Sequence, residues 1–209
     1  MNLTQAKRIV GSDLGKASKM PGYTIGISAD HCNVGSKLAE IQGSVCAGCY
    51  AKKDNYQYPS VKVSHARRLD GLTDPDWPEA MATLIRKRCH AVRYFRWHDS
   101  GDVQNLDHLH AIVEVCQLTP EVRHWLPTHE RALIKQFRAV FGPLPGNLEV
   151  RLSDAMVDAP APRSKAWHTS GVTTDPDKAT CRAFENNGKC GACRKCWDPT
   201  IERVVYLQH

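Results

Sequence analysis

The sequence predicts an α/β fold in which parallel strands are joined by crossover helices, with a cysteine-rich C-terminal segment packed on the core. The chain has 209 residues, of which 42% are hydrophobic and 24% are charged, as expected for a globular domain. Strand-like and helix-like patterns alternate through the middle of the chain. This alternation is typical of parallel strands with right-handed crossovers, arranged as a partial barrel or as an open sheet.

Five segments are predicted to be strands because they are short, rich in β-branched and aromatic residues, and bounded by turn formers. The clearest, Val-Arg-Tyr-Phe-Arg-Trp-His, ends in the turn sequence Asp-Ser-Gly-Asp. In chain order the predicted strands cover residues 23–28, 92–98, 122–127, 148–152 and 203–207.

Three segments between these strands are predicted to be helices. The first follows Asp76, a residue type that caps helix N-termini. The other two carry apolar residues at helical spacing, and the last ends at the breaker pair Gly142-Pro143. The helices are expected over residues 77 to about 90, 106–118 and 131 to about 141.

The chain divides into three parts that we expect to form a single globular unit. Residues 1–157 form the α/β core and include the first cysteine group. Residues 158–180, rich in Pro, Ser, Thr and Gly, are predicted to be a long loop. Residues 181–209 form a cysteine-rich segment that would bind a cluster and pack on the core.

Polar side chains gather where three predicted strands end, and parallel α/β folds bring such ends to the face that holds the active site. Each residue also has an ordinary explanation as a turn former, helix cap or core histidine, so the convergence is the main functional argument. The predicted acid–base or substrate-positioning groups are His98, Asp99, Asp102, His129 and Asp154. The predicted cofactor contacts are Ser100, Thr128 and Ser153.

The C-terminal cysteine group predicts a metal site. Cys190, Cys193 and Cys196 follow one another at two-residue gaps, and Cys181 could supply a fourth thiolate. This run recurs in iron–sulfur proteins, whereas structural zinc sites usually use two separated Cys-x-x-Cys pairs. An iron–sulfur site is therefore favoured, with zinc as the alternative.

The N-terminal group has three cysteines, Cys32, Cys46 and Cys49, after the first predicted strand. Three thiolates can hold a 4Fe–4S cluster and leave one iron without a protein ligand, as metal-centred catalysis requires. Members of both groups could instead converge on one cluster, with the remaining cysteines structural. The sequence leaves open whether there is one cluster or two.

Several motifs together resemble the phage gene product eighty-eight family, and the resemblance covers most of the chain. They are Cys32, the run from Cys46 to Ala51, the strand end from His98 to Asp102, and the motif ending at Cys196-Trp197. This resemblance implies a phage protein.

More distantly, a strand, a cysteine loop and then alternating helices and strands resemble a shortened radical S-adenosylmethionine barrel. That resemblance implies a 4Fe–4S cluster on Cys32, Cys46 and Cys49, with S-adenosylmethionine on the open iron. The sequence departs from that pattern, because thirteen residues separate Cys32 from Cys46 and no Gly-Gly-Glu segment is found. The resemblance therefore supports cluster binding by this chain better than it supports S-adenosylmethionine binding.

These observations predict a viral iron–sulfur enzyme in which the open iron acts as a Lewis acid, in aconitase-like hydration or in hydrolysis. One alternative is a radical S-adenosylmethionine enzyme. Another is a non-catalytic protein, either a redox or electron-transfer protein or one stabilised structurally by zinc.

Net charge and hydropathy limit the classes of ligand and partner that the sequence predicts. The net charge is +6, which suits a small anionic ligand, but Lys and Arg are scattered, so nucleic-acid binding is not expected. No segment is long and apolar enough to span a membrane, and residues 1–10 lack an apolar signal core. We expect a protein of the host cytoplasm, and the sequence leaves the oligomeric state open.

Overall fold

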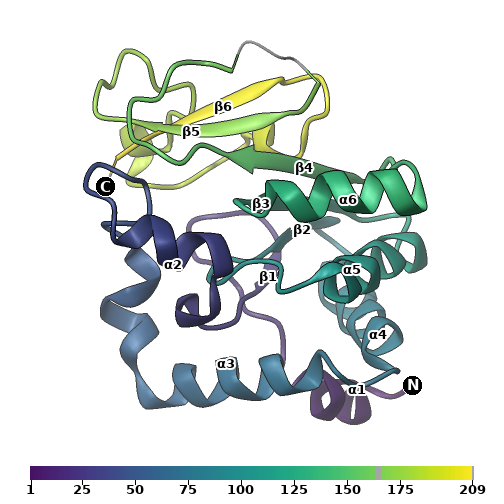
Figure 1. Cartoon of the computed structure of the whole chain (residues 1–209). Coiled ribbons are helices and arrows are strands. Elements are labelled where there is room, and N and C mark those ends of the chain that lie inside the picture. The colour runs from purple at the N-terminus through teal and green to yellow at the C-terminus, as the bar shows by residue number, and fades with distance from the viewer. Residues whose placement is uncertain (163–165, 209) are drawn as a thin grey trace.

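The computed structural model describes residues 1–162 and 166–208, and they contain a six-stranded sheet in which every neighbouring pair is parallel. The strands lie in sequence order across the sheet, so β1 and β6 form its edges (Figure 1). This arrangement confirms the predicted α/β class with parallel strands. The bounds are β1 Tyr23–Ile25, β2 Tyr94–Trp97, β3 Arg123–Thr128, β4 Leu148–Ser153, β5 Thr169–Thr173 and β6 Arg203–Leu207.

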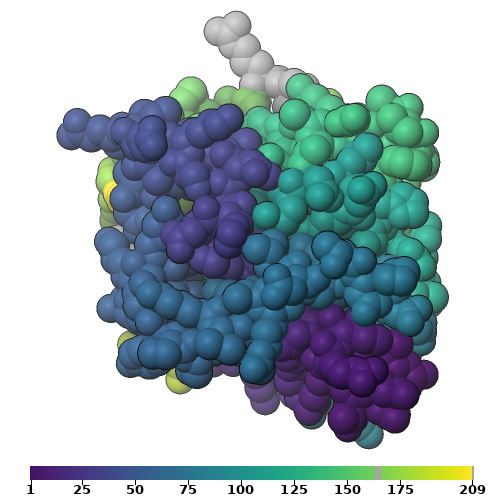
Figure 2. Space-filling view, turned by 60° about the horizontal axis from the view of Figure 1, so that its bottom comes forward, coloured from purple at the N-terminus to yellow at the C-terminus, as the bar shows by residue number. Residues whose placement is uncertain are grey.

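Helices flank the sheet, and those that follow β1, β2 and β3 return the chain to the next parallel strand. Figure 2 shows a face of the molecule formed mainly by the segments coloured purple to green, which include these helices. The α-helices are α1 Leu3–Val10, α2 Asn33–Ala39, α3 Pro59–Gly71, α4 Trp77–Cys89, α5 Leu106–Leu118 and α6 Arg131–Phe141. The 3-10 helices are η1 Ala29–His31, η2 Tyr50–Lys52, η3 Asp54–Gln57, η4 Ala183–Asn186 and η5 Lys195–Trp197.

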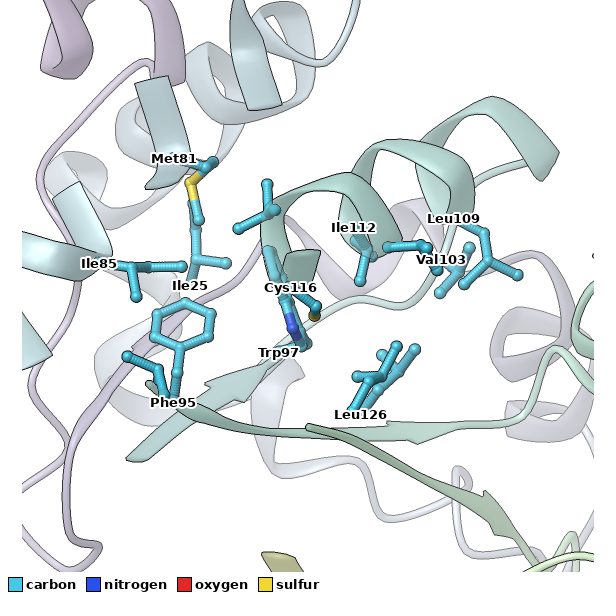
Figure 3. Packing of buried hydrophobic residues seen from close by; sticks show 14 of the residues in the cluster. Ile25, Met81, Ile85, Phe95, Trp97, Val103, Leu109, Ile112, Cys116 and Leu126 are labelled. Atoms are coloured by element: carbon cyan, nitrogen blue, oxygen red, sulfur yellow. The ribbon is translucent and has the colours of Figure 1, made fainter. Parts of the chain in front are cut away.

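The hydrophobic core lies between the sheet and helices α4 and α5 (Figure 3). Phe95 and Trp97 of β2 point into this layer, and their rings meet edge-on at 4.9 Å. Cys89 and Cys116, the two cysteines outside the N-terminal and C-terminal groups, are fully buried here. We call this side of the sheet the helix face. Burial of its apolar side chains fixes the positions of the strands and of their carboxyl ends.

The opposite side of the sheet, the inner face, is covered by the C-terminal cysteine segment. Trp197 of η5 packs on Tyr94 and Trp125, with ring centroids 5.4 and 5.2 Å apart, and its indole donates to the Phe95 carbonyl at 2.8 Å. Because strand residues alternate between faces, Tyr94 and Trp125 lie on the side opposite Phe95. Trp197 therefore covers part of the inner face at β2 and β3, where Tyr94 and Arg96 stay partly exposed.

The structure corrects the prediction of a long loop over residues 158–180, because strand β5 lies within it. Its sequence, Thr-Ser-Gly-Val-Thr, is short and follows a Pro-rich stretch, so it carries little apolar signal. Its pairing with β4 and β6 supplies the stabilisation that the local sequence does not. Residues 163–165 of that predicted loop, and residue 209, lie outside the described residues.

Other predicted elements differ in detail. Helix α4 begins after Asp76, but the Asp76 side chain makes no capping hydrogen bond. Helices α1, α2 and α3 were not predicted, since they are short or mostly polar. Within the part of the chain that the structure describes, no helix has both the length and the apolar character needed to cross a membrane.

Candidate functional site

Cys32 and Cys46 converge on the backbone of Gly35. Cys32 occupies the N-cap position of α2, and Gly35 lies within the first turn of that helix. A β-carbon built at Gly35 would lie 3.0 Å from Cys32 Cβ, 3.5 Å from Cys32 Sγ and 3.7 Å from Cys46 Sγ. The two thiols therefore meet over bare backbone, where any larger residue would crowd them.

Cys49 joins this pair through a tight turn. The Cys49 amide donates to the Cys46 carbonyl at 3.2 Å, which closes the Cys-Ala-Gly-Cys turn. The turn is held against the chain that leaves β4, because the Val45 amide donates to the Ala155 carbonyl at 3.0 Å. We call Cys32, Cys46 and Cys49 the first cysteine group. It lies beside the carboxyl ends of β3 and β4, where parallel folds place active sites.

The surroundings of the first cysteine group oppose ionisation of the Cys32 and Cys46 thiols. Burial raises the pKa of Cys32 to about 12 and that of Cys46 to about 11. The Asp102 carboxylate and the Cys49 sulfur act in the same direction as burial on both pKa values. A bound metal supplies the positive charge that such a site lacks and holds its ligands as thiolates. The donor set therefore fits a cationic metal centre.

Asp102 ties the ends of β2 and β3 together below this group. Its Oδ1 accepts from the Thr128 hydroxyl at 2.6 Å and from the Val103 amide at 2.8 Å, and its Oδ2 accepts from the His129 amide at 2.8 Å. Burial raises the pKa of Asp102 to about 7 in spite of these three donors. Nearby, Glu130 Oε1 accepts from the Val34 amide at 2.9 Å and so anchors α2.

His129 is the predicted acid–base residue that lies against a cysteine. Its Nε2 is 3.7 Å from Cys46 Sγ. Burial lowers the pKa of His129 to about 4, and the nearby Arg131 cation acts in the same direction. The imidazole is therefore neutral near pH 7.

His98 and Asp99 lie at the end of β2 in different surroundings. His98 is buried, packs edge-on against His108 at 5.3 Å, and has no hydrogen-bond partner for either ring nitrogen among the described residues. Burial and the neighbouring His108 hold its pKa well below the usual value. Asp99 accepts from the Tyr56 hydroxyl at 3.3 Å and, through its carbonyl, from the Tyr50 hydroxyl at 2.6 Å. Asp99 therefore contacts the segment that follows Cys49.

The remaining predicted residues make hydrogen bonds within the protein. The Ser100 hydroxyl donates to the Ile27 carbonyl at 2.6 Å and links the chains leaving β1 and β2. The Ser153 hydroxyl is 3.4 Å from that of Ser170 on β5. Asp154 pairs with Arg203 at 2.6 Å and Arg131 at 3.5 Å, so its carboxylate is already neutralised by two cations.

The C-terminal cysteines also gather in one place, and we call Cys181, Cys190, Cys193 and Cys196 the second cysteine group. Burial raises the pKa of Cys196 to about 11, and the Cys181 and Cys190 sulfurs act in the same direction. Cys181 and Cys193 act on Cys190 in the same way. All four sulfurs are therefore within electrostatic reach of at least one other.

This second group is fixed rigidly to the inner face. Arg151, which is fully buried on β4, donates to the carbonyls of Cys196, Lys195, Asp198 and Ile201 at 2.7–3.1 Å. Gly188 and Gly191 both have positive φ, at +76° and +54°, which allows the sharp turns of this segment. All nine cysteines are free thiols.

Neither group surrounds a single point. Across residues 1–162 and 166–208, no three His, Cys, Asp or Glu side chains are arranged as ligands of one metal ion. A cubane cluster makes a different geometric demand, because each of its irons takes its own cysteine and the sulfurs stand farther apart.

Three residues near the site were missed by the sequence analysis: Tyr50, Arg96 and Tyr206. Arg96 Nη2 donates to the Tyr50 hydroxyl at 3.2 Å, and the Tyr206 hydroxyl is 3.2 Å from Cys196 Sγ. The available signals were the position of Tyr50 directly after Cys49 and the alternation of Arg96 with aromatic residues in β2.

Comparison with known families gives one match. The family model described as Gene product 88 matches residues 1–199. Comparison with curated proteins and with solved structures finds no match.

Proposed function

The chain belongs to the Gene product 88 family, a family of phage gene products, and on that premise we propose that it is an iron–sulfur enzyme. In this proposal Cys32, Cys46 and Cys49 hold a 4Fe–4S cluster with one open iron. The observation that carries the proposal is the convergence of Cys32 and Cys46 over Gly35, with the His129 imidazole 3.7 Å from Cys46 Sγ.

When bound, a cluster with an open iron supplies a Lewis acid that polarises a substrate oxygen or activates water. His129 then accepts or returns the proton, since its imidazole is neutral and next to the first cysteine group. Asp102 positions His129 by accepting its backbone amide. Glu130 holds the start of α2, and with it Cys32, in place. The reaction class is hydration or hydrolysis.

The second cysteine group would hold a further cluster that is closed by four protein ligands. Its four sulfurs influence one another electrostatically, and no predicted acid–base side chain contacts them. Such a site suits electron storage or structural support better than substrate binding. Zinc at this group is the alternative.

The strand order favours a second candidate function. Six parallel strands in sequence order, with a cysteine loop after the first, match what a shortened radical S-adenosylmethionine barrel would require. In that case the open iron would take S-adenosylmethionine instead of a substrate oxygen. The missing Gly-Gly-Glu segment counts against this candidate.

The test is an anaerobic purification with iron, sulfide and zinc counted per chain, together with absorption and EPR spectra. We expect brown protein with about four irons per cluster. The triple variant Cys32→Ser/Cys46→Ser/Cys49→Ser should lose one cluster's iron, and serine at the four cysteines of the second group should lose the other. The control is Cys89→Ala/Cys116→Ala, which alters cysteines outside both groups and should keep all the iron.

Two further EPR measurements distinguish the Lewis-acid enzyme from the radical S-adenosylmethionine enzyme. Brief air exposure should remove one iron from the three-cysteine cluster and produce an EPR signal, as an open position predicts. Addition of S-adenosylmethionine should leave the EPR spectrum of the reduced protein unchanged, and a shift would favour the second candidate. Unchanged iron and spectra in the triple variant would contradict the proposal, as would colourless protein with zinc and no sulfide.

A further inference from the structure

The inner face of the sheet carries two arginines whose surroundings differ sharply. Arg151 on β4 is fully buried and its donors are matched by four backbone carbonyls. It also pairs with Glu149 at 3.2 Å. Arg151 is therefore satisfied within the protein and serves to hold the second cysteine group.

Arg96 on β2 has much weaker partners. One terminal nitrogen donates to the Tyr50 hydroxyl at 3.2 Å, and the other is 3.5 Å from the Met20 thioether sulfur. The buried Nε has no hydrogen-bond partner, and no carboxylate forms an ion pair with Arg96 anywhere in the described residues. The guanidinium lies 4.8 Å from the Trp125 ring centroid. A cation in such a place gains from any anion that can reach it.

The nearest acidic side chain does not fill this role. Asp99 influences Arg96 electrostatically but accepts the Tyr56 hydroxyl instead of a guanidinium nitrogen. The Tyr50 hydroxyl donates its hydrogen bond to the Asp99 carbonyl at 2.6 Å. It therefore acts as an acceptor toward Arg96. The half-buried Arg96 thus keeps donors that the chain leaves unmatched.

Arg96 also stands between the two cysteine groups. Its partner Tyr50 directly follows Cys49 of the first group. On the other side, the Arg96 charge acts on Cys190 of the second group and on Tyr206, whose hydroxyl is 3.2 Å from Cys196 Sγ. A small molecule held by Arg96 would therefore lie close to the loop that carries the first group.

We propose that Arg96 binds the oxyanion of a small substrate, a carboxylate or a phosphate, next to Tyr50 in the segment that directly follows the first cysteine group. This inference rests on the proposed function and names its substrate class. A guanidinium presents paired donors that match a planar carboxylate or a phosphate face, and here it packs against the Trp125 ring. The net charge of +6 acts in the same direction at longer range.

The test measures anion binding to the anaerobically purified full chain whose iron content has been counted. The probes are malonate and inorganic phosphate at constant ionic strength, followed by calorimetry and by tryptophan fluorescence. We expect Arg96→Gln to weaken binding by about tenfold or more, and Arg96→Lys to restore part of it. The matched control is Arg123→Gln, an exposed arginine at the start of β3 whose loss should leave the affinity unchanged.

Binding of malonate alone would identify a carboxylate substrate, and binding of phosphate alone would identify a phosphate. Absence of binding by both probes, or equal affinity in the wild type and Arg96→Gln, would overturn the inference. The iron count separates this failure from that of the proposed function. Iron-loaded protein that ignores both anions contradicts only the role of Arg96, whereas anion binding by iron-free protein contradicts only the cluster.

Discussion

The two cysteine groups are built in opposite ways. The first has three cysteines on loops at the carboxyl ends of the strands, next to a neutral imidazole and a buried carboxylate. The second has four cysteines in a segment that Arg151 and Trp197 clamp onto the inner face of the sheet. A site with fewer ligands and titratable neighbours is suited to chemistry, whereas a fully ligated and rigid site is suited to support or electron storage.

The two cysteine groups also differ in which parts of the fold hold them in place. The first group depends on the ends of β2, β3 and β4, so a change at any of those ends should disturb it. The second group depends mainly on one arginine and one tryptophan. Mutations can therefore weaken one group while the other is left intact.

The largest effect is expected from Arg151→Ala. It takes a donor from four carbonyls, of which those of Lys195 and Asp198 keep a backbone donor, and it removes the cation that pairs with Glu149. Breaking a buried pair of this kind costs about 3–5 kcal/mol in the free energy of unfolding. Denaturant unfolding measures the loss, and iron counting should show depletion of the second group only. The exposed control Arg123→Ala should change stability by less than about 0.5 kcal/mol.

A smaller loss is expected from Thr128→Val, which acts on the first group. The Thr128 hydroxyl donates to Asp102 and accepts from the Glu130 amide at 3.0 Å, so its removal takes one of three donors from Asp102 and leaves the buried Glu130 amide without this acceptor. The expected cost is about 1–3 kcal/mol, with iron lost from the first group. Thr200→Val, at an exposed hydroxyl in the C-terminal segment, should have little effect on either measurement. Equal iron loss from both groups would contradict their independence.

Acid should weaken the region of the first group through His108. Its Nδ1 accepts from the Gln104 amide at 3.2 Å and so supports the loop that carries Asp102. Burial lowers the folded-state pKa of His108 to about 4, below the unfolded value of about 6.5. The unfolded chain therefore binds more protons in this range, and stability present above pH 6.5 is lost as the pH falls toward 4. The slope is at most about 1.4 kcal/mol per pH unit for this one group.

The measurement for this prediction is the free energy of unfolding of wild type and His108→Gln between pH 7 and pH 5, by denaturant titration. The variant should show a shallower pH dependence than the wild type by up to one proton. Identical slopes would show that His108 is not kept neutral by its surroundings.

The smallest change in stability, with a clear change in iron, is expected from Gly35→Ala. Alanine favours a helix over glycine by about 1 kcal/mol, but its methyl group would lie 3.0 Å from Cys32 Cβ. Stability should stay within about 1 kcal/mol of the wild type while iron in the first group falls. Gly48→Ala, where an added β-carbon meets nothing within 4 Å, is the control. Full iron content in Gly35→Ala would contradict the convergence of the thiols over Gly35.

Part of the fold and of the candidate site could be predicted from the sequence, because the patterns that determine it lie in adjacent residues. The helix at 106–118 and the helix at 131–141 have the predicted bounds, since apolar periodicity and the Gly142-Pro143 stop are properties of adjacent residues. The division of seven cysteines into two groups was also visible. β5 was missed because Thr-Ser-Gly-Val-Thr becomes a strand through its pairing with β4 and β6.

The sequence by itself determined the α/β class, the strand ends that carry His129 and Asp102, and the cysteine spacing. Only the tertiary structure decided which side chains are already matched within the protein and which keep unmatched donors. Arg96 and Arg151 are the same residue type on the same face, yet four carbonyls satisfy one and a phenol and a thioether face the other. The physical reason is that hydrogen-bond partners come from segments far apart in the chain, and only folding brings them within reach.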